Sequence, residues 1–380
     1  MNILVAPNSM KGSLSAFQFA CLIEKAFNDA VPAFFNIRKL PVADGGDDTV
    51  NVLINALDLA IQTVAVADPL GRTVMAQYGY SDGLAVIEMA SASGMNLLTS
   101  DELNPLKTSS YGTGQLILDA IRIGAKKIYV GIGGSATVDG GMGMLEALGI
   151  QFLDSNQVLL TGNGENLGEI DQIITSNLLI HNDIEIIVIS DVDNLLLGDE
   201  GAARVFGPQK GATPQMVELL ERNLSHYAGV IKKCLAKDVT RLKGGGAAGG
   251  ISVAFSAFMN AKIVAGADYI LDVISIDESI QWADLVITGE GRMDEQTLMN
   301  KAPYAVAMRA RKFGKPVIAI AGSVSLTNSK LFDGLFSILN KPMSLDEAIE
   351  NVAGLTYRSS VELALLISKL SAIKPLNGTL

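Results

Sequence analysis

Short apolar runs alternate along the chain with longer segments in which apolar residues recur every three or four positions. Short apolar runs bounded by turn residues predict buried strands, and the three-to-four-residue recurrence predicts amphipathic helices. Near the two ends of the chain, the predicted strands are residues 2–7, 34–42, 284–289, 316–322 and 334–339. The predicted helices there are residues 15–30, 49–57, 297–313 and 345–371. This alternation predicts a parallel sheet with helices on both faces.

The middle of the chain has a different pattern. Three strand-like runs between residues 61 and 90 are separated by short turns that include PLG and SDG, which predicts local antiparallel pairing. Helical segments follow at residues 112–123, 140–148 and 214–236. The middle therefore predicts a mixed sheet with helices, in contrast to the parallel pattern at the two ends.

The length of the chain predicts two domains. With 380 residues, of which 49% are hydrophobic, the chain can form two cores rather than one. We predict an α/β fold in which residues 1–60 and 283–380 form one discontinuous parallel-sheet domain. Residues 61–282 form a mixed α/β domain inserted between the two parts.

Composition and charge argue against several classes of protein. The apolar runs are far shorter than the roughly 20 residues of a membrane-spanning helix. The N-terminal segment lacks the features of a signal peptide, so we expect a cytoplasmic protein without a membrane segment. The formal net charge is −11 and no cluster of Lys or Arg stands out, which argues against a nucleic-acid partner. Cys21 and Cys234 have no metal-ligand spacing and are expected to be buried thiols.

Four loops rich in Gly, Ser or acidic residues follow predicted strands of the end domain. They are APNSMKGS, PVADGGDD, TGEGRMDEQT and AGS. In an open parallel sheet, ligands bind beyond the carboxyl ends of the strands. Because all four loops follow strands of the same predicted sheet, we expect them to share one edge and to form a ligand site there.

The glycine-rich stretch GIGGSATVDGGMGML, residues 131–145, directly follows an apolar run. It matches G-x-G-x-x-G/A, but no second strand with a suitable acidic residue follows, so a nicotinamide site is disfavoured. The P-loop spacing is absent, so a Walker-type nucleotide site is disfavoured as well. The amides of Gly133, Gly134 and Ser135 can instead bind an anion, with the helix from about Gly140 adding its positive end. The alternative is a tight strand-to-helix turn. A second cluster, GGGAAGG, favours packing at a helix start over a phosphate loop.

Acidic residues lie at or just after predicted strands. They are Asp44, Asp191, Asp193, Glu290 and Asp294. Mg²⁺ takes carboxylate oxygens and usually keeps waters and substrate phosphates as its other ligands. A single Asp in such a position is more often a turn former, but five acids at strand ends favour a shared site.

Positively charged residues occupy matching positions. Lys11 follows the first strand, Lys210 lies in VFGPQKGAT, and Arg292 lies in GEGR. Each can hold a phosphate or a small carboxylate. For Lys210 the alternative is a solvated lysine at the surface.

Nucleophilic catalysis has little support. The chain contains two histidines, His181 in a polar turn and His226 on a predicted helix, and neither a G-x-S-x-G elbow nor a Cys–His pairing is visible. The ligand groups of a zinc site are missing as well. Glycine loops, carboxylates and a few cations fit phosphoryl transfer best, because in that chemistry the protein mainly positions groups and neutralises charge.

Together these motifs resemble those of the class I bacterial glycerate kinases. In chain order they are APNSMKGSLSA, PVADGGDDT, IEMASASG, NPLKTSSYGTGQLI, GIGGSATVDGGMGML, DVDN, VFGPQKGAT, GAAGG, TGEGRMDEQT and IAGS. The resemblance extends from Met1 to about Ser371. It implies transfer of the γ-phosphoryl group of ATP to glycerate, with ATP and Mg²⁺ as cofactors. It also implies a flavodoxin-like domain made from both chain ends, an inserted domain similar to a restriction-enzyme fold, and an active site in the cleft between them.

Three places depart from the usual pattern of this family. Asn8 stands where the family often has Asp, Asp47 and Asp48 stand in place of Glu-Gly, and Val138 stands where the family usually has Asn. The changes at Asn8 and Val138 remove charge or polarity from predicted site loops. They affect the expected acceptor more than the reaction class, and a related hydroxy acid is the alternative acceptor.

We assign candidate roles to individual residues on this basis. Asp191 is the candidate general base, because the apolar run IEIIVIS before it is expected to desolvate its carboxylate and raise its pKa. The candidate catalytic residues are Asp191 and Lys11, and the candidate substrate-binding residues are Ser9, Asp44, Thr113, Lys210 and Arg292. The candidate nucleotide-binding residues are Gly133, Gly134, Ser135, Asp139, Gly289 and Glu290, and the candidate metal ligands are Asp191, Glu290 and Asp294.

Other functions stay open at this point. A kinase of another small hydroxy or sugar acid would use the same site with a different acceptor pocket. The family favours the 2-hydroxyl of glycerate, and phosphorylation of the 3-hydroxyl is the alternative. Outside kinases, a catalytically silent ligand sensor and a dinucleotide-dependent reductase are the competing functions. Release of ADP in the presence of a hydroxy acid would distinguish a kinase from both.

Overall fold

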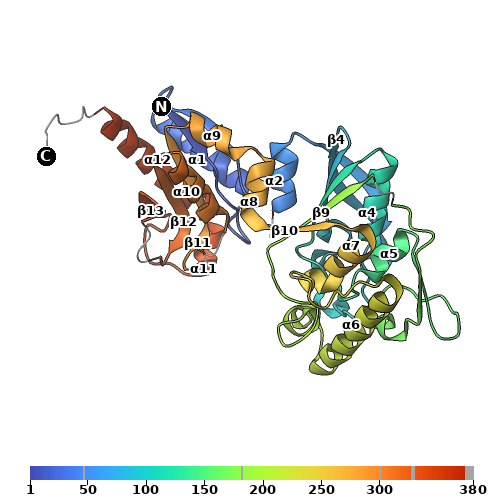
Figure 1. Cartoon of the computed structure of the whole chain (residues 1–380). Helices are drawn as coiled ribbons and strands as arrows, with labels where there is room; N and C mark the ends of the chain where they lie inside the picture. The colour runs from blue at the N-terminus through green and yellow to red at the C-terminus, as the bar shows by residue number, and fades with distance from the viewer. Residues whose placement is uncertain (46–47, 181–182, 296, 299–300, 327–329, 373–380) are drawn as a thin grey trace. The chain divides into compact units, whose positions relative to one another are not determined.

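The computed structural model describes residues 1–380 except 46–47, 181–182, 296, 299–300, 327–329 and 373–380. Asp47 and His181, which the sequence analysis discusses, lie outside the described residues. Internal contacts divide the chain into two compact units (Figure 1). Unit 1 comprises Met1–Ala56 and Gly266–Leu380, and unit 2 comprises Leu57–Ala265.

Unit 1 contains a five-stranded sheet. Its strands are β1 (Asn2–Val5), β2 (Asn36–Lys39), β11 (Leu285–Met293), β12 (Val317–Val324) and β13 (Gly334–Ser337). Their spatial order is β13-β12-β11-β1-β2, and all neighbouring pairs are parallel. This is the 2-1-3-4-5 order of flavodoxin-like folds. The predicted flavodoxin-like domain made from both ends of the chain is therefore confirmed.

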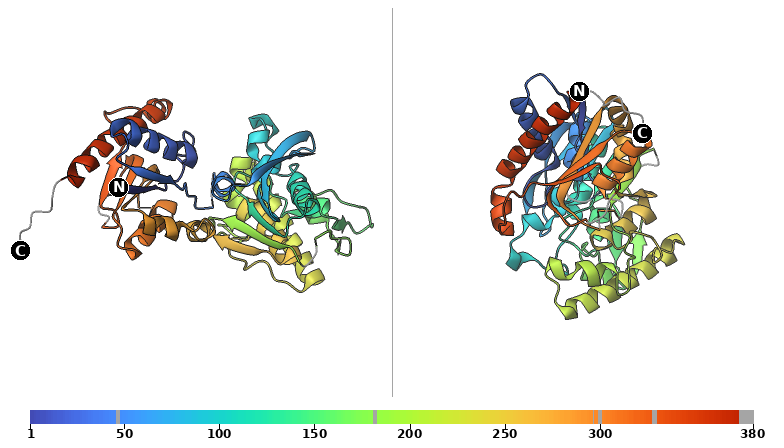
Figure 2. Two further views of the ribbon diagram at one scale, coloured as in Figure 1. Left: turned by 90° about the horizontal axis from the view of Figure 1, so that it is seen from above. Right: turned by 90° about the vertical axis from the view of Figure 1, so that its left-hand side faces the viewer.

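Helices cover both faces of the unit 1 sheet. α1 (Ala16–Ala30) and α12 (Val352–Ser371) pack side by side on one face, and α10 (Ala302–Lys312) packs on β11 and β12 from the other (Figure 2). Phe19, Ile23 and Phe27 of α1 join apolar residues of β1 and β11 in the core. The remaining helices of unit 1 are α2 (Thr49–Ala56), α8 (Gly266–Val273), α9 (Ile276–Trp282) and α11 (Leu345–Glu350).

The second boundary between the units differs from the prediction. The sequence analysis places it near residue 283, whereas the contacts place it between Ala265 and Gly266. The difference consists of α8 and α9, which pack against α10 of unit 1. Arg309 of α10 pairs with Asp272 at 2.7 Å and with Asp277 at 3.2 Å. The apolar face of a short helix does not indicate which sheet or helix it packs against. The hydrophobic pattern alone therefore assigned α8 and α9 to the wrong unit.

Unit 2 contains a six-stranded mixed sheet. Its strands are β3 (Ala60–Ala67), β4 (Thr73–Ser81), β5 (Leu84–Glu88), β6 (Lys127–Gly131), β9 (Glu185–Ser190) and β10 (Lys262–Ala265). Their order is β10-β9-β6-β5-β4-β3. The first three strands along the chain pair antiparallel, as predicted, and β5, β6, β9 and β10 are parallel. Two short strands, β7 (Gln151–Leu153) and β8 (Gln172–Ile174), form a separate antiparallel pair.

The helices of unit 2 pack on this sheet and on one another. The α-helices are α3 (Ala90–Ser93), α4 (Tyr111–Arg122), α5 (Met142–Ala147), α6 (Pro214–Leu235) and α7 (Ile251–Met259). The short helical turns are η1 (Met95–Leu97), η2 (Ser100–Glu102), η3 (Asn166–Glu169), η4 (Ala202–Phe206), η5 (Pro208–Lys210) and η6 (Ala247–Gly250). α4 lies on β3, β4 and β5 and also packs against α5. Apolar side chains from all of these layers form the core of unit 2.

Two further expectations from the sequence concern membrane-spanning helices and the two cysteines. No helix among the described residues is long and apolar enough to cross a membrane. Cys21 is half-buried and Cys234 on α6 is exposed, so the prediction of a buried thiol is wrong for Cys234. Val230 and Ile231, about one turn before Cys234, are buried, but Cys234 lies in the last turn of α6, where the burial ends.

Two strands extend beyond their predicted ends. The prediction ends them at residues 289 and 322, whereas β11 continues to Met293 and β12 to Val324. In the extension Glu290 pairs with Ala321, and Arg292 pairs with Ser323. The composition of TGEGRM is typical of a loop, but the neighbouring strand supplies the backbone partners. The sheet therefore fixes the positions of Glu290 and Arg292.

Candidate functional site

The strand order of unit 1 reverses between β1 and β11, and ligands of open α/β sheets bind at such a switch point. The segment after β1 carries Asn8 and Ser9, and the end of β11 carries Glu290. The Asn8 amide donates to the Gly289 carbonyl at 2.7 Å and joins the two segments directly. The structure thus places residues that are about 280 positions apart at the edge where the sequence analysis expects a ligand site.

Gly289, a candidate nucleotide-binding residue, has a packing role at the switch point. A Cβ atom at this position would lie 1.9 Å from the carbonyl oxygen of Ile320 and 3.2 Å from the ring of Phe19. Both distances are shorter than an ordinary van der Waals contact. The glycine therefore allows β11, β12 and α1 to pack closely behind the switch point.

Asn8 links the loops after β1 and β2. Its Nδ2 donates to Asp44 Oδ2 at 3.2 Å, and its Oδ1 accepts the amide of Ser9 at 2.8 Å. Asn8 is 7% exposed, so both contacts are shielded from water. An ionised aspartate at this position could accept the Ser9 amide but could not donate to Asp44. The neutral side chain therefore suits its place beside an acidic partner.

Glu290 is a buried carboxylate at the end of β11. It is 6% exposed, the Thr297 hydroxyl donates to its Oε1 at 2.7 Å, and Lys301 Nζ lies 3.9 Å from its Oε2. Burial raises the pKa of Glu290, and the nearby carboxylates of Asp44 and Asp294 raise it further, while Thr297 and Lys301 oppose the rise. The carboxylates of Asp44, Glu290 and Asp294 therefore act on one another electrostatically.

Sequence reasoning missed Thr297 as a functional residue. Its hydroxyl is fully buried, donates to Glu290, and accepts the amide of Asp294 at 3.1 Å. The motif TGEGRMDEQT contains this threonine, and its place three residues after Asp294 in a turn was the available signal. Such a hydroxyl commonly bonds to a nearby backbone amide.

The two predicted cations of unit 1, Lys11 and Arg292, lie at its surface. Arg292 is exposed along most of its side chain, and its Nε lies 3.1 Å from Asp294 Oδ2. Lys11 is exposed in the loop after β1. That loop, which includes Ser9, lines a cavity of about 260 Å³, and Asp48 lines the same cavity. Lys11, the candidate catalytic residue, and Arg292 and Ser9, candidate substrate-binding residues, are thus all accessible to a small anionic ligand.

In unit 2 the predicted anion loop follows β6. Ser135 is buried, and only Gly133 and Gly134 are appreciably exposed. The amide of Ala136 donates to the Ser93 carbonyl, and the Gly134 carbonyl accepts the Met95 amide. Within the described residues, the amides of Gly133, Gly134 and Ser135 donate to no protein acceptor. Three neighbouring donors at an exposed turn match the predicted anion-binding loop.

Asp139 has a structural role in place of the predicted phosphate contact. It is fully buried, and its carboxylate accepts the Ser110 amide and hydroxyl at 2.8 and 2.6 Å and the Gly141 and Gly143 amides at 3.0 and 3.3 Å. Burial raises the pKa of Asp139, and these hydrogen bonds oppose the rise. In its ionised form, the Asp139 carboxylate would also repel a phosphate placed beside it. Asp139 therefore holds the start of α5 against the start of α4.

Two further residues discussed in the sequence analysis, Thr113 and Val138, are fully buried. Thr113 on α4 is fully buried, and its hydroxyl lies 2.8 Å from the Ser93 hydroxyl. A contact between Thr113 and a glycerate carboxylate is therefore not supported. Val138 is fully buried in the core of unit 2. Its difference from the family pattern alters packing and does not remove a polar group from the site surface.

Lys210 lies behind the anion loop and not at the surface. It is 1% exposed, and its Nζ donates to Ser135 Oγ and to the Thr137 carbonyl, each at 2.7 Å. Burial lowers the pKa of Lys210 to about 7, and Asp139 opposes this only in part. Direct binding of a substrate by Lys210 is therefore contradicted, and so is the alternative of a solvated lysine.

The second glycine cluster supports the loop through packing, as the sequence favours. A Cβ atom on Gly249 would lie 2.0 Å from the Thr137 carbonyl oxygen, and the Gly140 amide donates to the Gly249 carbonyl at 3.0 Å. Gly249 has a φ of +73°, which a residue with a side chain adopts only with strain. The cluster is therefore a close packing contact.

Asp191 is the first residue after β9 and is exposed. The strand before it is buried, but that burial does not extend to the Asp191 side chain, so the desolvation expected from the sequence is absent. Asp191 belongs to unit 2, whereas Glu290 and Asp294 belong to unit 1. In the part of the chain that the structure describes, no three His, Cys, Asp or Glu residues form a group that could hold a metal ion. The three predicted metal ligands are therefore divided between the two units.

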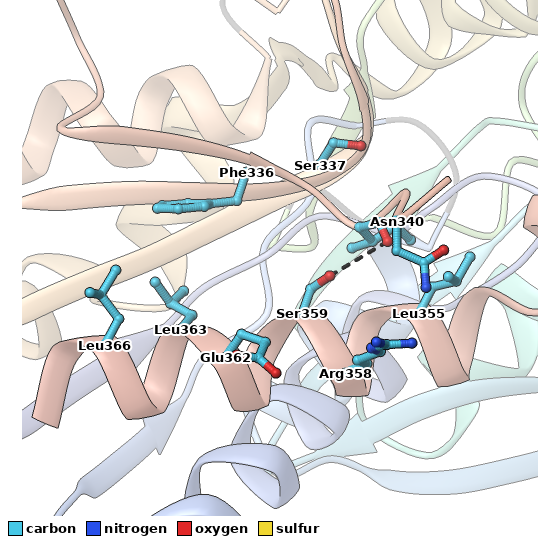
Figure 3. Close-up of a pocket in the computed structure, with 10 residues that line it drawn as sticks. Phe336, Ser337, Asn340, Leu355, Arg358, Ser359, Glu362, Leu363 and Leu366 are labelled. Atoms are coloured by element: carbon cyan, nitrogen blue, oxygen red, sulfur yellow. Dashed lines mark hydrogen bonds between the residues drawn. The ribbon is translucent and has the colours of Figure 1, made fainter. Parts of the chain in front are cut away.

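A separate groove lies outside the candidate site. It has a volume of about 260 Å³ and lies between β13 and α12 (Figure 3). Phe336, Leu363 and Leu366 form its apolar wall, and Arg358 and Glu362 lie on the same side of α12. None of its lining residues is a candidate site residue, so the groove is not part of the site described above.

Comparison with known proteins gives consistent similarities. The model of the Glycerate kinase family matches residues 3–368. The chain is 43% identical to the glycerate kinase of Halalkalibacterium halodurans over 96% of this chain and 98% of that protein. It is 44% identical to the glycerate 2-kinase of Escherichia coli K12, over 96% and 97%. A crystal structure from Salmonella typhimurium LT2, provisionally assigned as glycerate kinase 2, matches with a TM-score of 0.87 at 41% identity, covering 98% of this chain and 100% of that one.

Proposed function

The chain belongs to the glycerate kinase family, and from this premise we propose that it transfers the γ-phosphoryl group of ATP to the 2-hydroxyl of glycerate. The products are 2-phosphoglycerate and ADP. ATP-dependent phosphorylation of glycerate is the activity of the family. The choice of the 2-hydroxyl rests on one observation, the similarity to a glycerate 2-kinase over nearly the whole length of both proteins.

We propose that the loop after β6 binds phosphate oxygens of the nucleotide. The amides of Gly133, Gly134 and Ser135 supply three donors without protein acceptors among the described residues. Glycine at positions 133 and 134 lets a phosphate approach the backbone, because no Cβ atom stands in the way. Backbone amide donors do not titrate, so these three donors are available to a polyphosphate at any pH.

We propose that unit 1 binds the acceptor at the switch point between β1 and β11. Ser9, Lys11 and Arg292 are accessible there, and a small hydroxy acid carries one carboxylate for such groups to hold. Asp44 is held by Asn8 and can accept a hydroxyl of the substrate. A carboxylate with two hydroxyls matches a site that combines cations with hydrogen-bond acceptors.

We propose that Asp191 accepts the proton of the attacking hydroxyl. The 2-oxygen of glycerate forms a bond with the γ-phosphorus, and the bond from that phosphorus to the bridging oxygen breaks. The electron pair of this bond leaves with ADP, and the proton passes to the Asp191 carboxylate. The exposed position of Asp191 just beyond β9 leaves it reachable by a small acid.

Replacing Asp191 tests this assignment. Asp191→Asn keeps the shape and removes the proton acceptor, so we expect kcat to fall roughly 10²- to 10⁴-fold. Because the loop after β6 is unchanged, affinity for MgATP should change little. Steady-state kinetics and nucleotide binding measure the two effects, and normal turnover in the variant would reject the role of Asp191.

We propose that Mg²⁺ enters with the nucleotide. Mg²⁺ is usually bound by one or two carboxylates together with substrate phosphates and water. The mutual repulsion of Asp44, Glu290 and Asp294 is what such an ion would relieve. The ion would supply neutralisation of phosphate charge.

Phosphorus NMR of the product tests the proposed reaction directly. Incubation of the protein with glycerate and MgATP should give the resonance of 2-phosphoglycerate, and 3-phosphoglycerate would reject the proposed position. A parallel screen of small hydroxy acids, compared by kcat/KM, tests whether Asn8 alters the preferred acceptor. Absence of ADP release with every acid would favour the silent sensor.

A further inference from the structure

We propose that Lys210 is a positioning residue for nucleotide binding. It acts through Ser135 and leaves the Ser135 hydroxyl proton free for a phosphate oxygen of the nucleotide. The inference rests on the proposed function, since it concerns how the loop after β6 recognises phosphates. It differs from the predicted role of Lys210, which was direct contact with a substrate.

The hydrogen bonds of Lys210 fix the direction of donation. Its Nζ lies 2.7 Å from Ser135 Oγ and 2.7 Å from the Thr137 carbonyl oxygen. A protonated lysine side chain has no acceptor, so when Lys210 is charged Ser135 Oγ must accept and its own hydrogen remains to be donated. At 1% exposure the lysine cannot itself meet a ligand at the surface. The Ser135 hydroxyl is thus the group through which its charge can act.

The turn that carries Lys210 is held in place from behind. Lys210 ends η5, and the next residue, Gly211, has a φ of +90°. A Cβ atom on Gly211 would lie 2.3 Å from the Leu103 carbonyl oxygen. The second acceptor, the Thr137 carbonyl, is held by the close approach of Gly249. The ammonium is therefore clamped between two fixed segments, which is what positioning requires.

The front of the loop is left open to a ligand. The hydrogen bonds to Ser93 and Met95 fix the loop through the Ala136 amide and the Gly134 carbonyl. The amides of residues 133–135 take no part in them, and Gly134 at the tip is exposed with a φ of +69°. Three amide donors and one hydroxyl donor then belong to one short turn, and such turns bind phosphate.

The charge of Lys210 should respond to a bound phosphate. Burial lowers its pKa to about 7, and Asp139, which lies before α5, is the charged group that opposes this shift. Asp139 is itself buried among donors from α4 and α5, and burial raises its pKa. A negative charge arriving at the loop favours the protonated lysine. Binding of a nucleotide above pH 7 should therefore take up a proton.

Calorimetry of MgADP binding tests the inference on the full chain. At pH 8, in buffers with different ionisation enthalpies, we expect the wild-type protein to take up roughly half a proton or more per nucleotide. Lys210→Met should abolish the uptake and weaken MgADP binding about tenfold, which corresponds to one hydrogen bond to a charged group. A lysine that served only to stabilise the fold would not change the number of protons taken up.

Two further variants make the test specific. Lys233→Met removes an exposed lysine on α6 and should leave proton uptake, affinity and activity unchanged. Ser135→Ala keeps Lys210 and removes the hydroxyl, and it should also weaken MgADP binding about tenfold. In the double variant the two effects should not multiply, because both substitutions break the same chain of hydrogen bonds.

The outcomes separate this inference from the proposed function. Absence of proton uptake in the wild-type protein, or unchanged MgADP affinity in Ser135→Ala, would overturn the inference even if Lys210→Met failed to fold. Multiplicative effects of the two substitutions would overturn it as well. A protein that binds MgADP with proton uptake but does not phosphorylate glycerate would reject the proposed function and leave the inference standing.

Discussion

At the residue scale, the hydrogen bond from the Thr297 hydroxyl favours the charged form of the Glu290 carboxylate. It donates to Glu290 Oε1 at 2.7 Å and opposes the effect of burial, which raises the pKa of Glu290. Thr297→Val keeps the shape and removes the donor, so the pKa of Glu290 should rise further. If the ionised form of Glu290 is required, the acidic limb of the kcat/KM profile should move to higher pH. At pH values on the acidic limb, kcat/KM of the variant should be several-fold lower than that of the wild-type protein.

The matched control for this substitution is Thr297→Ser, which keeps the hydroxyl and loses only a methyl group. It should restore the wild-type pH profile, apart from a small loss of stability for the missing methyl group. An acidic limb that stays in place in Thr297→Val would show that Glu290 is not the group that titrates.

Asn8 provides a test of the proposed Mg²⁺ site. Its Nδ2 donates to Asp44 Oδ2 at 3.2 Å, and an ionised aspartate would replace that donor with a repelling oxygen. Asn8→Asp should therefore lower Tm in the absence of divalent cations, by several degrees for a cost of about 1–2 kcal/mol. Mg²⁺ should recover most of this loss, because the ion can bind between two carboxylates.

Thermal unfolding with and without Mg²⁺ measures this effect. Asn8→Ala serves as the control, because it removes the same hydrogen bond without adding a charge, and Mg²⁺ should not rescue it. Equal responses of the two variants to Mg²⁺ would argue against a cation site beside Asp44.

Side-chain burial limited what the sequence could predict about single residues. The sequence indicated that Lys210, Asp139 and Thr113 belong to loops or helices around the glycine-rich turn, and the structure places Lys210 and Asp139 there. It could not indicate whether each side chain points outward or inward. That direction depends on partners far away in the chain, such as Ser135 for Lys210 and Ser93 for Thr113.

At the element scale, the Asp139 carboxylate connects the starts of α4 and α5. It accepts the amides of Ser110, Gly141 and Gly143 within the buried core of unit 2. Asp139→Ala leaves these donors without an acceptor, and each unsatisfied buried donor costs about 1–3 kcal/mol. We therefore expect the free energy of unfolding to fall by about 3 kcal/mol or more in urea unfolding experiments.

The comparison variant for this loss is Asp154→Ala. Asp154 accepts two amides in a turn, from Asn156 and Val158, but it is only half-buried and these hydrogen bonds are exposed to water. Its loss should cost about 1 kcal/mol or less, because water can replace the missing acceptor. If Asp139→Ala kept its stability and only weakened nucleotide binding, Asp139 would be a ligand group after all.

The elements themselves follow closely from the hydrophobic pattern, and their ends do not. The parallel strands of unit 1 and the antiparallel strands β3, β4 and β5 lie where the pattern predicts them. The predicted helix 345–371 is divided into α11 and α12 at Asn351, whose side chain donates to the Glu347 carbonyl at 2.8 Å. The extension of β11 arises from pairing with β12. Both corrections come from hydrogen bonds that hydrophobic periodicity does not report.

At the scale of the whole molecule, the order of ten short motifs carried more information than any single one. Each motif alone fits a turn as well as a ligand site. Their order identified the family and, through it, the flavodoxin-like fold of the discontinuous domain that the strand and helix pattern had predicted. The motifs did not show to which unit α8 and α9 belong, because no motif lies between Gly266 and Trp282.

The continuous stretch Leu57–Ala265 should fold without the rest of the chain. Its six-stranded sheet is built from its own strands, and every residue of its large apolar core lies within this stretch. We expect a fragment of these residues to unfold cooperatively in urea, because domains with a core of their own usually fold independently. A broad, non-cooperative transition would show that the core requires residues of unit 1.

The same fragment separates the two halves of the proposed chemistry. It keeps the loop Gly133–Ser135 together with Lys210, so it should bind MgADP and take up a proton at pH 8. It lacks Asn8, Asp44 and Glu290, so it should neither bind glycerate nor release ADP from ATP. Calorimetry with each ligand in turn measures this division. Glycerate binding by the fragment would place the acceptor in unit 2 and would contradict the assignment of the β1 and β11 switch point to it.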